Sequence, residues 1–305
     1  MSGRNLRFTL AAWLFVAYLV AVILFGAYVR ISHSGDGCGS NWPTCHGDIV
    51  PASPSTATLV EFTHRVTSGL CGLLGLGLLG WAWRLHGTGT VTRAVALTVV
   101  FILIEGAIGA GLVLGELVGD DDSVARAVVI ALHLANTLAL TAFASLAAWR
   151  SSRPGPISFL SRRRAVFAFG IVAVVATSAT GAVTALGDTL FPREVSIGPG
   201  LLAEVGSDLS AGNHFLVRLR VLHPALALAA AGYLLWLLGP EADRNVWAKA
   251  AMYLVAAQVS VGFLSIALSA PAWVQIVHLL AAHAVWIALI LAAASLAPRG
   301  AVLRA

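Results

Sequence analysis

Four histidines, His64, His133, His223 and His278, lie at similar depth in alternate apolar segments of this 305-residue chain. An imidazole inside a bilayer needs partners for its ring nitrogens, and intramembrane ionisable groups are functional candidates by default. Histidine is a common metal ligand and holds heme iron from an axial position. Two pairs at matched depth therefore predict two axially bound metal centres, and heme iron is the expected metal.

The competing interpretation is that each histidine is a hydrogen-bonded packing residue, which is commoner for a single intramembrane histidine. Four of them in alternate segments favour ligation. Zinc is less suitable because no compact cluster of Cys, His and carboxylate side chains accompanies them. His283 lies five residues after His278, about 140° around a helix, so one helix cannot direct both at one iron. We expect His278 to be the ligand because its depth matches the other three, and His283 remains the alternative.

Glu61 precedes His64 by three residues, so both side chains project from one face of a helix. A carboxyl group beside a heme can accept or relay protons, or stabilise developing positive charge. The alternative is an acid that caps the helix near its positive N-terminal end. Arg220, not an acid, stands three residues before His223. The first half is therefore expected to carry the chemistry, and the second half electron transfer or structure.

Several arginines near the histidines could pair with heme propionates, since guanidinium groups bind carboxylates through paired hydrogen bonds. They are Arg65, Arg126, Arg218 and Arg220. Glu105 lies in the middle of an apolar segment, and Gln258 occupies the corresponding place in the second half. We expect a packing or polar-network role for Glu105.

The composition indicates a polytopic membrane protein, with 58% hydrophobic and 11% charged residues. Apolar runs of about 20 residues, the length that crosses a bilayer, recur along the chain. Their approximate bounds are 8–29, 61–83, 94–118, 124–149, 165–187, 215–238, 249–269 and 272–297. We predict an all-α fold of eight transmembrane helices in two pseudo-repeated four-helix bundles, surrounded by membrane lipid. The first run exceeds the about 7–15 residues of a signal-peptide core and is expected to be retained.

The loop charges predict the orientation. On one side of the predicted spans lie 13 of the 19 Lys and Arg residues, while most acids, including those at 120–122, lie on the other. Both termini are therefore expected to be cytoplasmic, and the loops 30–60 and 188–214 to face outward from the cell membrane. Because the basic residues cluster in short loops, the net charge of +5 does not indicate a nucleic-acid partner.

The cysteines are consistent with this orientation. Cys38 and Cys45 both lie in the first outward loop, where an oxidising compartment permits a disulfide. We expect the bond, with two free thiols as the alternative. Cys71 stands alone in the second span and is expected to be a small packing residue.

The two halves of the chain resemble each other weakly. A stretch rich in Pro, Ser and Arg from Arg150 to Arg164 separates four spans from four, so we predict halves at residues 1–154 and 155–305. The first and fifth spans end in the similar segments FGAYVRISHSG and TGAVTALGD. Pro224 removes a backbone donor and is expected to kink the sixth span near His223.

Taken together, several segments resemble the heme A synthase family. They are EFTHR from Glu61 to Arg65, GCGSNWPTCHG from Gly37 to Gly47, and the later His133, His223 and His278. The resemblance covers essentially the whole chain. It implies oxidation of the C8 methyl group of heme O to a formyl group, by successive hydroxylations to a geminal diol that loses water, which gives heme A for terminal oxidases.

The resemblance also assigns roles. His64 and His133 would bracket the substrate heme O in the half 1–154, with Glu61 beside it, and His223 and His278 would hold a heme b in the half 155–305. Cys38 and Cys45 match the outer cysteine pair of the family. Heme O synthase and an electron donor that the sequence leaves unidentified are the implied partners, and a homo-oligomer remains open.

The chain departs from the family in two places. Some members carry a second cysteine pair in the loop that corresponds to 188–214, which has none here, and several have Arg where this chain has Pro224. Two other functions stay open. A diheme b-type cytochrome would pass electrons, for example from quinol, without modifying heme, and a transporter or assembly scaffold would bind no heme. The acid beside only one histidine pair and the cysteine loop favour the enzyme.

Overall fold

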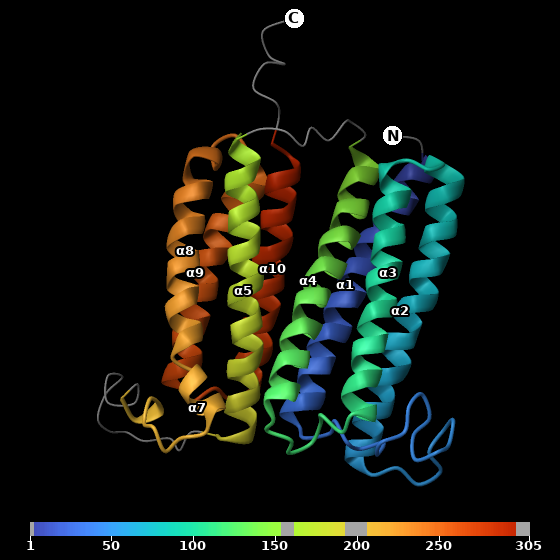
Figure 1. Cartoon of the computed structure of the whole chain (residues 1–305). Coiled ribbons are helices and arrows are strands. Elements are labelled where there is room, and N and C mark those ends of the chain that lie inside the picture. The colour runs from blue at the N-terminus through green and yellow to red at the C-terminus, as the bar shows by residue number, and fades with distance from the viewer. Residues whose placement is uncertain (1–2, 154–161, 193–205, 297–305) are drawn as a thin grey trace, which may run out of the picture.

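The computed structural model describes residues 3–153, 162–192 and 206–296. Eight of its helices are long and apolar enough to cross a membrane, as predicted. Among the described residues there is no strand, and only Cys45 and Asp48 form an isolated bridge. The protein is therefore an all-α polytopic membrane protein (Figure 1).

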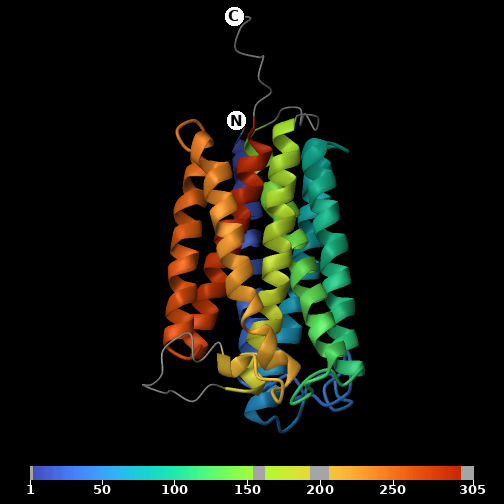
Figure 2. The ribbon, with the colours of Figure 1, turned by 60° about the vertical axis from the view of Figure 1, so that its left-hand side comes forward.

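The helices follow one another along the chain, and a long loop joins α1 to α2 (Figures 1 and 2). They are α1 (Gly3–Ile31), α2 (Thr56–His86), α3 (Thr90–Leu114), α4 (Val124–Ser152), α5 (Arg162–Leu190), α7 (Phe215–Leu219), α8 (Leu222–Leu238), α9 (Val246–Ala267) and α10 (Ala272–Ala294). A 3₁₀ turn, η1 (Gly239–Glu241), follows α8.

The predicted start of the second span was five residues late. Helix α2 begins at Thr56 because Ser55 caps it, with its hydroxyl accepting a hydrogen bond from the backbone N–H of Thr58 at 3.1 Å. A polar capping residue and a polar first turn concealed this start from a search for apolar residues. The third span ends at Leu114 rather than at residue 118, because Gly115 terminates the helix.

The sixth span is broken, in agreement with the expected kink. It consists of α7 and α8, with Arg220 and Val221 between them. Pro224 lies in the first turn of α8, where its missing N–H is tolerated. Continuation of one helix through this point would place the proline ring against the carbonyl group of Arg220.

The two largest apolar clusters each lie within one group of helices. One is built from α1 to α4 around Phe8, Phe15 and Val95, and the other from α5 and α8 to α10 around Phe167, Leu238 and Leu289. Figure 1 shows these two groups side by side. They meet where α4 and α1 pack against α5 and α10.

A hydrogen bond crosses the contact between the two groups of helices. The indole N–H of Trp286 on α10 donates to the carbonyl oxygen of Leu138 on α4 at 2.7 Å. The predicted boundary between residues 154 and 155 lies outside the described residues, and the division into two repeated halves stays a prediction.

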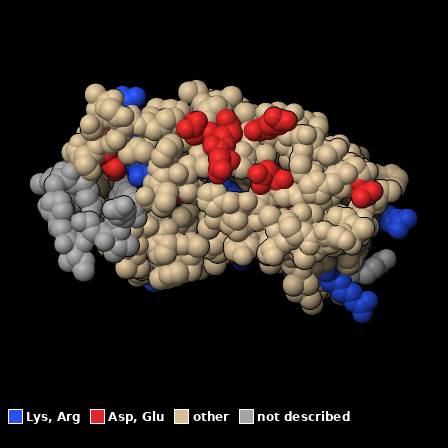
Figure 3. Space-filling view, turned by 90° about the horizontal axis from the view of Figure 1, so that it is seen from below, with Lys and Arg blue, Asp and Glu red and all other residues tan. Residues whose placement is uncertain are grey.

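The first residues of α1 and the last residues of α10 lie at the same end of the bundle (Figure 1). The opposite end carries a group of acidic side chains, which Figure 3 shows near the middle of that face. Exposed acids of the connecting segments there include Asp36, Glu116, Asp120 and Asp122. This distribution agrees with the charge pattern that predicts cytoplasmic termini, and the orientation in the cell stays a prediction.

Candidate functional site

A cavity of about 1680 Å³ extends between the helices of both groups. It is larger than the roughly 300–1,000 Å³ of a site for one small molecule. All four predicted histidines line it. The lining is mostly apolar, with a few charged groups that include Glu61, Arg65 and Glu105.

The four histidines lie at closely matched depth. Counted from the first residue of its span, His64 lies eight residues in, His133 nine, His223 eight and His278 six. At about 1.5 Å per helical residue, all four are roughly 9–14 Å from the outer helix ends. The earlier start of α2 therefore brings His64 closer to the depth of the others than the sequence suggested.

Each pair of histidines comes from helices that lie diagonally across a four-helix group. Helices α2 and α4 both pack on α1 and α3, while α8 and α10 both pack on α5 and α9. Side chains from facing helices then point into the centre of the group. Cofactors of helical bundles are commonly held in this way.

In the second group, His223 and His278 face each other directly. Their ring centres are 6.3 Å apart and the ring planes are inclined by 88°. Two imidazoles that bind one iron from opposite sides, with metal–nitrogen bonds of about 2 Å, have ring centres about 6 Å apart. The spacing of this pair therefore fits a shared heme iron.

The ring of His223 is held in one orientation. Its Nδ1 lies 3.1 Å from the carbonyl oxygen of Thr177 and 3.3 Å from the hydroxyl of Thr180. A carbonyl oxygen only accepts, so Nδ1 carries the proton and Nε2 keeps its lone pair. Metal-binding histidines are commonly oriented by such a contact on the other nitrogen.

His278 is contacted by Gln258 of α9. The side-chain nitrogen of Gln258 lies 3.2 Å from Nε2 of His278, and Nδ1 of His278 is buried without a hydrogen-bond partner among the described residues. Iron ligation through Nε2 requires the Gln258 amide to turn away from this nitrogen. Of the two histidines on α10, His278 and His283, it is His278 whose ring lies opposite His223.

In the first group, His64 and His133 line the same cavity from α2 and α4. The ring of His64 packs edge-to-face against Phe25, and its Nδ1 is buried without a hydrogen-bond partner in the described part of the chain. Nδ1 of His133 lies 3.2 Å from a carboxylate oxygen of Glu105. That the two histidines share one iron stays a prediction.

Glu105 is the centre of a polar network in α3 and α4. Its carboxylate accepts hydrogen bonds from the side chains of Asn136 and Thr137 and contacts His133. Gln258, which the sequence placed at the corresponding position of the second half, contacts Nε2 of His278 through its amide nitrogen, whereas Glu105 contacts Nδ1 of His133. In both groups a polar side chain therefore meets a histidine of the following helix.

Glu61 is buried at the cavity and strongly bound. Its Oε2 accepts a hydrogen bond from the backbone N–H of Cys38 at 2.8 Å, and its Oε1 accepts from Nε of Arg65 at 3.0 Å. Cys38 and Cys45 form the expected disulfide. Arg65 also donates to the carbonyl oxygens of Asn41 and Thr44, both at 2.7 Å. The carboxylate is therefore fixed between α2 and the disulfide loop.

Three of the four predicted propionate partners line the cavity, and each already has partners within the chain. Arg65 binds Glu61, Arg220 pairs with Asp188 at 2.9 Å, and Arg126 donates to the carbonyl oxygens of Gly119 and Asp121. The Nε of Arg126 is buried and has no hydrogen-bond partner among the described residues. Arg218 is exposed and lies outside the cavity lining.

The sequence reasoning missed the glycines that make room for the histidines. A Cβ atom at Gly26 would lie 3.0 Å from His64, one at Gly181 would lie 2.8 Å from His223, and one at Gly262 would lie 3.2 Å from His278. The shared glycine in FGAYVR and TGAVTA was the available signal.

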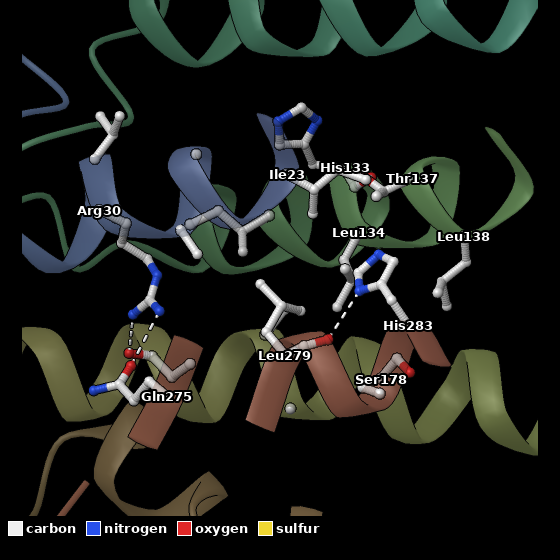
Figure 4. Close-up of a pocket in the computed structure, with 18 of the residues that line it drawn as sticks. Ile23, Arg30, His133, Leu134, Thr137, Leu138, Ser178, Gln275, Leu279 and His283 are labelled. Atoms are coloured by element: carbon white, nitrogen blue, oxygen red, sulfur yellow. Dashed lines mark hydrogen bonds between the residues drawn. The ribbon is translucent and has the colours of Figure 1, made fainter. Parts of the chain in front are cut away.

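Arg30 was also missed as a site residue. It lines the cavity and joins the two groups of helices, because its guanidinium donates to the carbonyl oxygen of Ala185, to Thr189 and, at 3.1 Å, to Gln275. Figure 4 shows its contact with Gln275.

Comparison with known proteins identifies the relatives of this chain. A family model described as cytochrome oxidase assembly protein, COX15-CtaA, matches residues 9–290. The heme A synthase of Halalkalibacterium halodurans is 34% identical over 184 residues, which cover 56% of this chain and 59% of that protein. The heme A synthase of an Exiguobacterium species is 37% identical over 129 residues, 42% of this chain and 40% of that protein.

A longer relative matches more of the chain. A protoheme IX farnesyltransferase of Thermus thermophilus is 44% identical over 299 residues, which cover 95% of this chain and 48% of that protein. The chain thus spans about half the length of these relatives.

Proposed function

The chain belongs to the COX15-CtaA family of cytochrome oxidase assembly proteins, and from this premise we propose that it is a membrane oxidoreductase that converts heme O to heme A. The reaction is oxidation of the C8 methyl group to a formyl group by successive hydroxylations. The enzyme works in the plasma membrane with both termini in the cytoplasm. The heme A synthases among its relatives support this assignment.

The observation that carries the proposal is the geometry of the histidine pairs. His223 and His278 have the spacing of axial ligands to one iron, and His64 and His133 stand on diagonal helices of the other group at similar depth. The cavity that all four line has the volume for more than one small molecule. A heme b between His223 and His278 supplies one-electron transfer, and heme O between His64 and His133 is the substrate.

The residues of the first group have distinct tasks. Glu105 orients His133, and the close approach of Gly26 fixes the ring position of His64. Glu61, 4% exposed, lies at the cavity three residues before His64, where it relays protons to or from the substrate site. Arg65 and the backbone N–H of Cys38 hold its carboxylate in place.

The apolar lining has a second role. It excludes bulk water from most of the cavity and accommodates the farnesyl tail of heme O. Arg126, with an unpaired Nε at the outer end, is the arginine best placed to bind a propionate.

The source of the substrate suggests a partner. The Thermus protein that resembles this chain over half of its own length is named protoheme IX farnesyltransferase. Transfer of a farnesyl group to protoheme produces heme O. We infer that a heme O synthase delivers heme O to this protein, and that a separate electron donor serves the second group of helices.

The test is to express the chain in cells that contain a heme O source and to separate the extracted hemes by chromatography. We expect heme A and its hydroxylated precursor under aerobic conditions. His64→Ala removes a proposed ligand of the substrate heme and should give neither product. His33→Ala, in the outer loop, is the matched control and should leave the yield unchanged. Recovery of heme B and heme O alone from the unmodified chain would support a b-type cytochrome instead.

A further inference from the structure

His283 is a buried histidine that the proposed function does not use. It lies on α10 with 1% of its surface exposed, and it lines the cavity. Figure 4 shows its ring directed toward α4, beside Leu134 and Leu138. It therefore lies where the two groups of helices meet, close to the first group.

The hydrogen bonding of His283 determines which nitrogen carries the proton. Its Nδ1 lies 3.0 Å from the carbonyl oxygen of Leu279, which can only accept, so Nδ1 is the donor. In the neutral ring Nε2 is then an acceptor. Nε2 is buried and has no hydrogen-bond partner among the described residues. A buried acceptor without a partner costs free energy, so a hydrogen bond from a donor to Nε2 would be stabilising.

The surroundings favour a donor from a bound molecule over a water. Of the cavity-lining side chains labelled near His283 in Figure 4, Leu134, Leu138 and Leu279 are apolar and Ser178 carries a hydroxyl group. A buried water needs two to four polar partners. The nearby hydroxyl of Thr137 is already donated to Glu105. A ligand that brings its own hydroxyl group into this apolar region meets the need without a second polar partner.

The polar groups of heme O differ in what they can offer. Its ionised propionates only accept hydrogen bonds, and its vinyl and methyl groups form none. The hydroxyl of the hydroxyethylfarnesyl side chain is a donor, and heme B has a vinyl group in its place. Figure 4 shows His283 beside Leu134, which directly follows His133 on α4, so His283 is near the proposed substrate site.

We propose that Nε2 of His283 accepts a hydrogen bond from the hydroxyl of the hydroxyethylfarnesyl group, and that this contact selects heme O over heme B. This inference rests on the proposed function. His283 is then a specificity residue rather than an iron ligand. The hydroxymethyl group formed during oxidation is a second hydroxyl of the same chemistry, and the experiment separates the two.

The experiment is an optical titration of the full-length protein, purified from cells that make heme B but no heme O. The probes are heme O, heme O whose side-chain hydroxyl has been converted to a methyl ether, and heme B. The variants are His283→Leu, which removes the acceptor, and His283→Gln, which supplies a carbonyl oxygen. The matched control is His86→Leu, since His86 also has a buried unpartnered Nε2 but lies outside the cavity lining.

We expect the unmodified protein to bind heme O about 3- to 10-fold more tightly than its methyl ether, the range for one neutral hydrogen bond. His283→Leu should abolish this preference, while His283→Gln and His86→Leu should retain most of it. A steric effect of the methyl group would persist in His283→Leu and would therefore contradict the proposal. Should His283→Leu fail to fold, equal binding of heme O and its ether by the unmodified protein would still overturn it.

The conversion of heme O by the same preparations separates the two proposals. Heme A formation together with an unchanged preference in His283→Leu would overturn the role of His283 and leave the proposed function standing. An unchanged preference with accumulation of hydroxylated heme in that variant would assign His283 to the hydroxymethyl group instead. No conversion by the unmodified protein would count against the proposed function itself.

Discussion

The backbone N–H of Cys38 donates a hydrogen bond to the carboxylate of Glu61, at 2.8 Å. The acid that the sequence placed beside His64 is therefore bound to the disulfide loop, and not only to its own helix. Arg65 extends the link, since it binds both Glu61 and the loop carbonyl groups. The loop and the proposed catalytic acid form one structural unit, and this suggests how each can be tested.

Replacement of Glu61 by glutamine should reduce conversion of heme O by about 100-fold or more, in the range observed for loss of a general acid or base. The amide can still accept from Cys38, so the loop should remain in place. Chromatography of extracted hemes gives the yield, and the spectrum of the second-group heme should be unchanged. Glu116→Gln, an exposed acid beyond α3, is the control. Normal yield from Glu61→Gln would remove Glu61 from the mechanism.

Removal of the disulfide should affect catalysis through Glu61. In a protein that carries both Cys38→Ser and Cys45→Ser, the loop loses its cross-link and the donor to Glu61 is less well fixed. We expect conversion to fall about 3- to 10-fold, the effect of weakening one hydrogen bond. Heme content measured from the absorption spectrum should stay normal. Ser40→Ala in the same loop should match the unmodified protein, and a double variant of full activity would show that the loop does not position Glu61.

Gly181 should not tolerate a side chain. A Cβ atom there would lie 2.8 Å from Cε1 of His223, so Gly181→Ala should displace the ring and lower the heme content of the second group. The control is Gly80→Ala, where a Cβ atom meets nothing within 4 Å. Because alanine favours helix by about 1 kcal/mol over glycine, the control should be neutral or stabilising. Equal heme-to-protein ratios in the two variants would contradict the proposed place of His223.

Glu105 should stabilise the fold by accepting hydrogen bonds from Asn136 and Thr137. Glu105→Leu leaves the side chains of Asn136 and Thr137 without their acceptor, which should lower the free energy of unfolding by about 1–3 kcal/mol. Glu105→Gln keeps one carbonyl oxygen and should lose less than half of that. Thermal unfolding in detergent measures both. A leucine variant as stable as the glutamine variant would show that the network contributes little.

Much of the fold followed from the sequence. Length and hydropathy predicted each membrane span because a bilayer demands long apolar helices that satisfy their own backbone hydrogen bonds. Local rules also placed the break before Pro224. Where a polar residue caps the start of a helix, as Ser55 does for α2, the predicted first residue of the span was more than one helical turn too late.

The sequence by itself determined the candidate residues for the site: histidines at matched depth, an acid one turn from His64, and two cysteines in one loop. It could do so because these types are costly in a membrane and their spacing along one helix is fixed. Only the tertiary structure decided which of them meet. Contacts between helices depend on how side chains of different segments pack, so the pairing of His223 with His278, the hydrogen bond from Cys38 to Glu61 and the unpaired nitrogen of His283 required the assembled bundle.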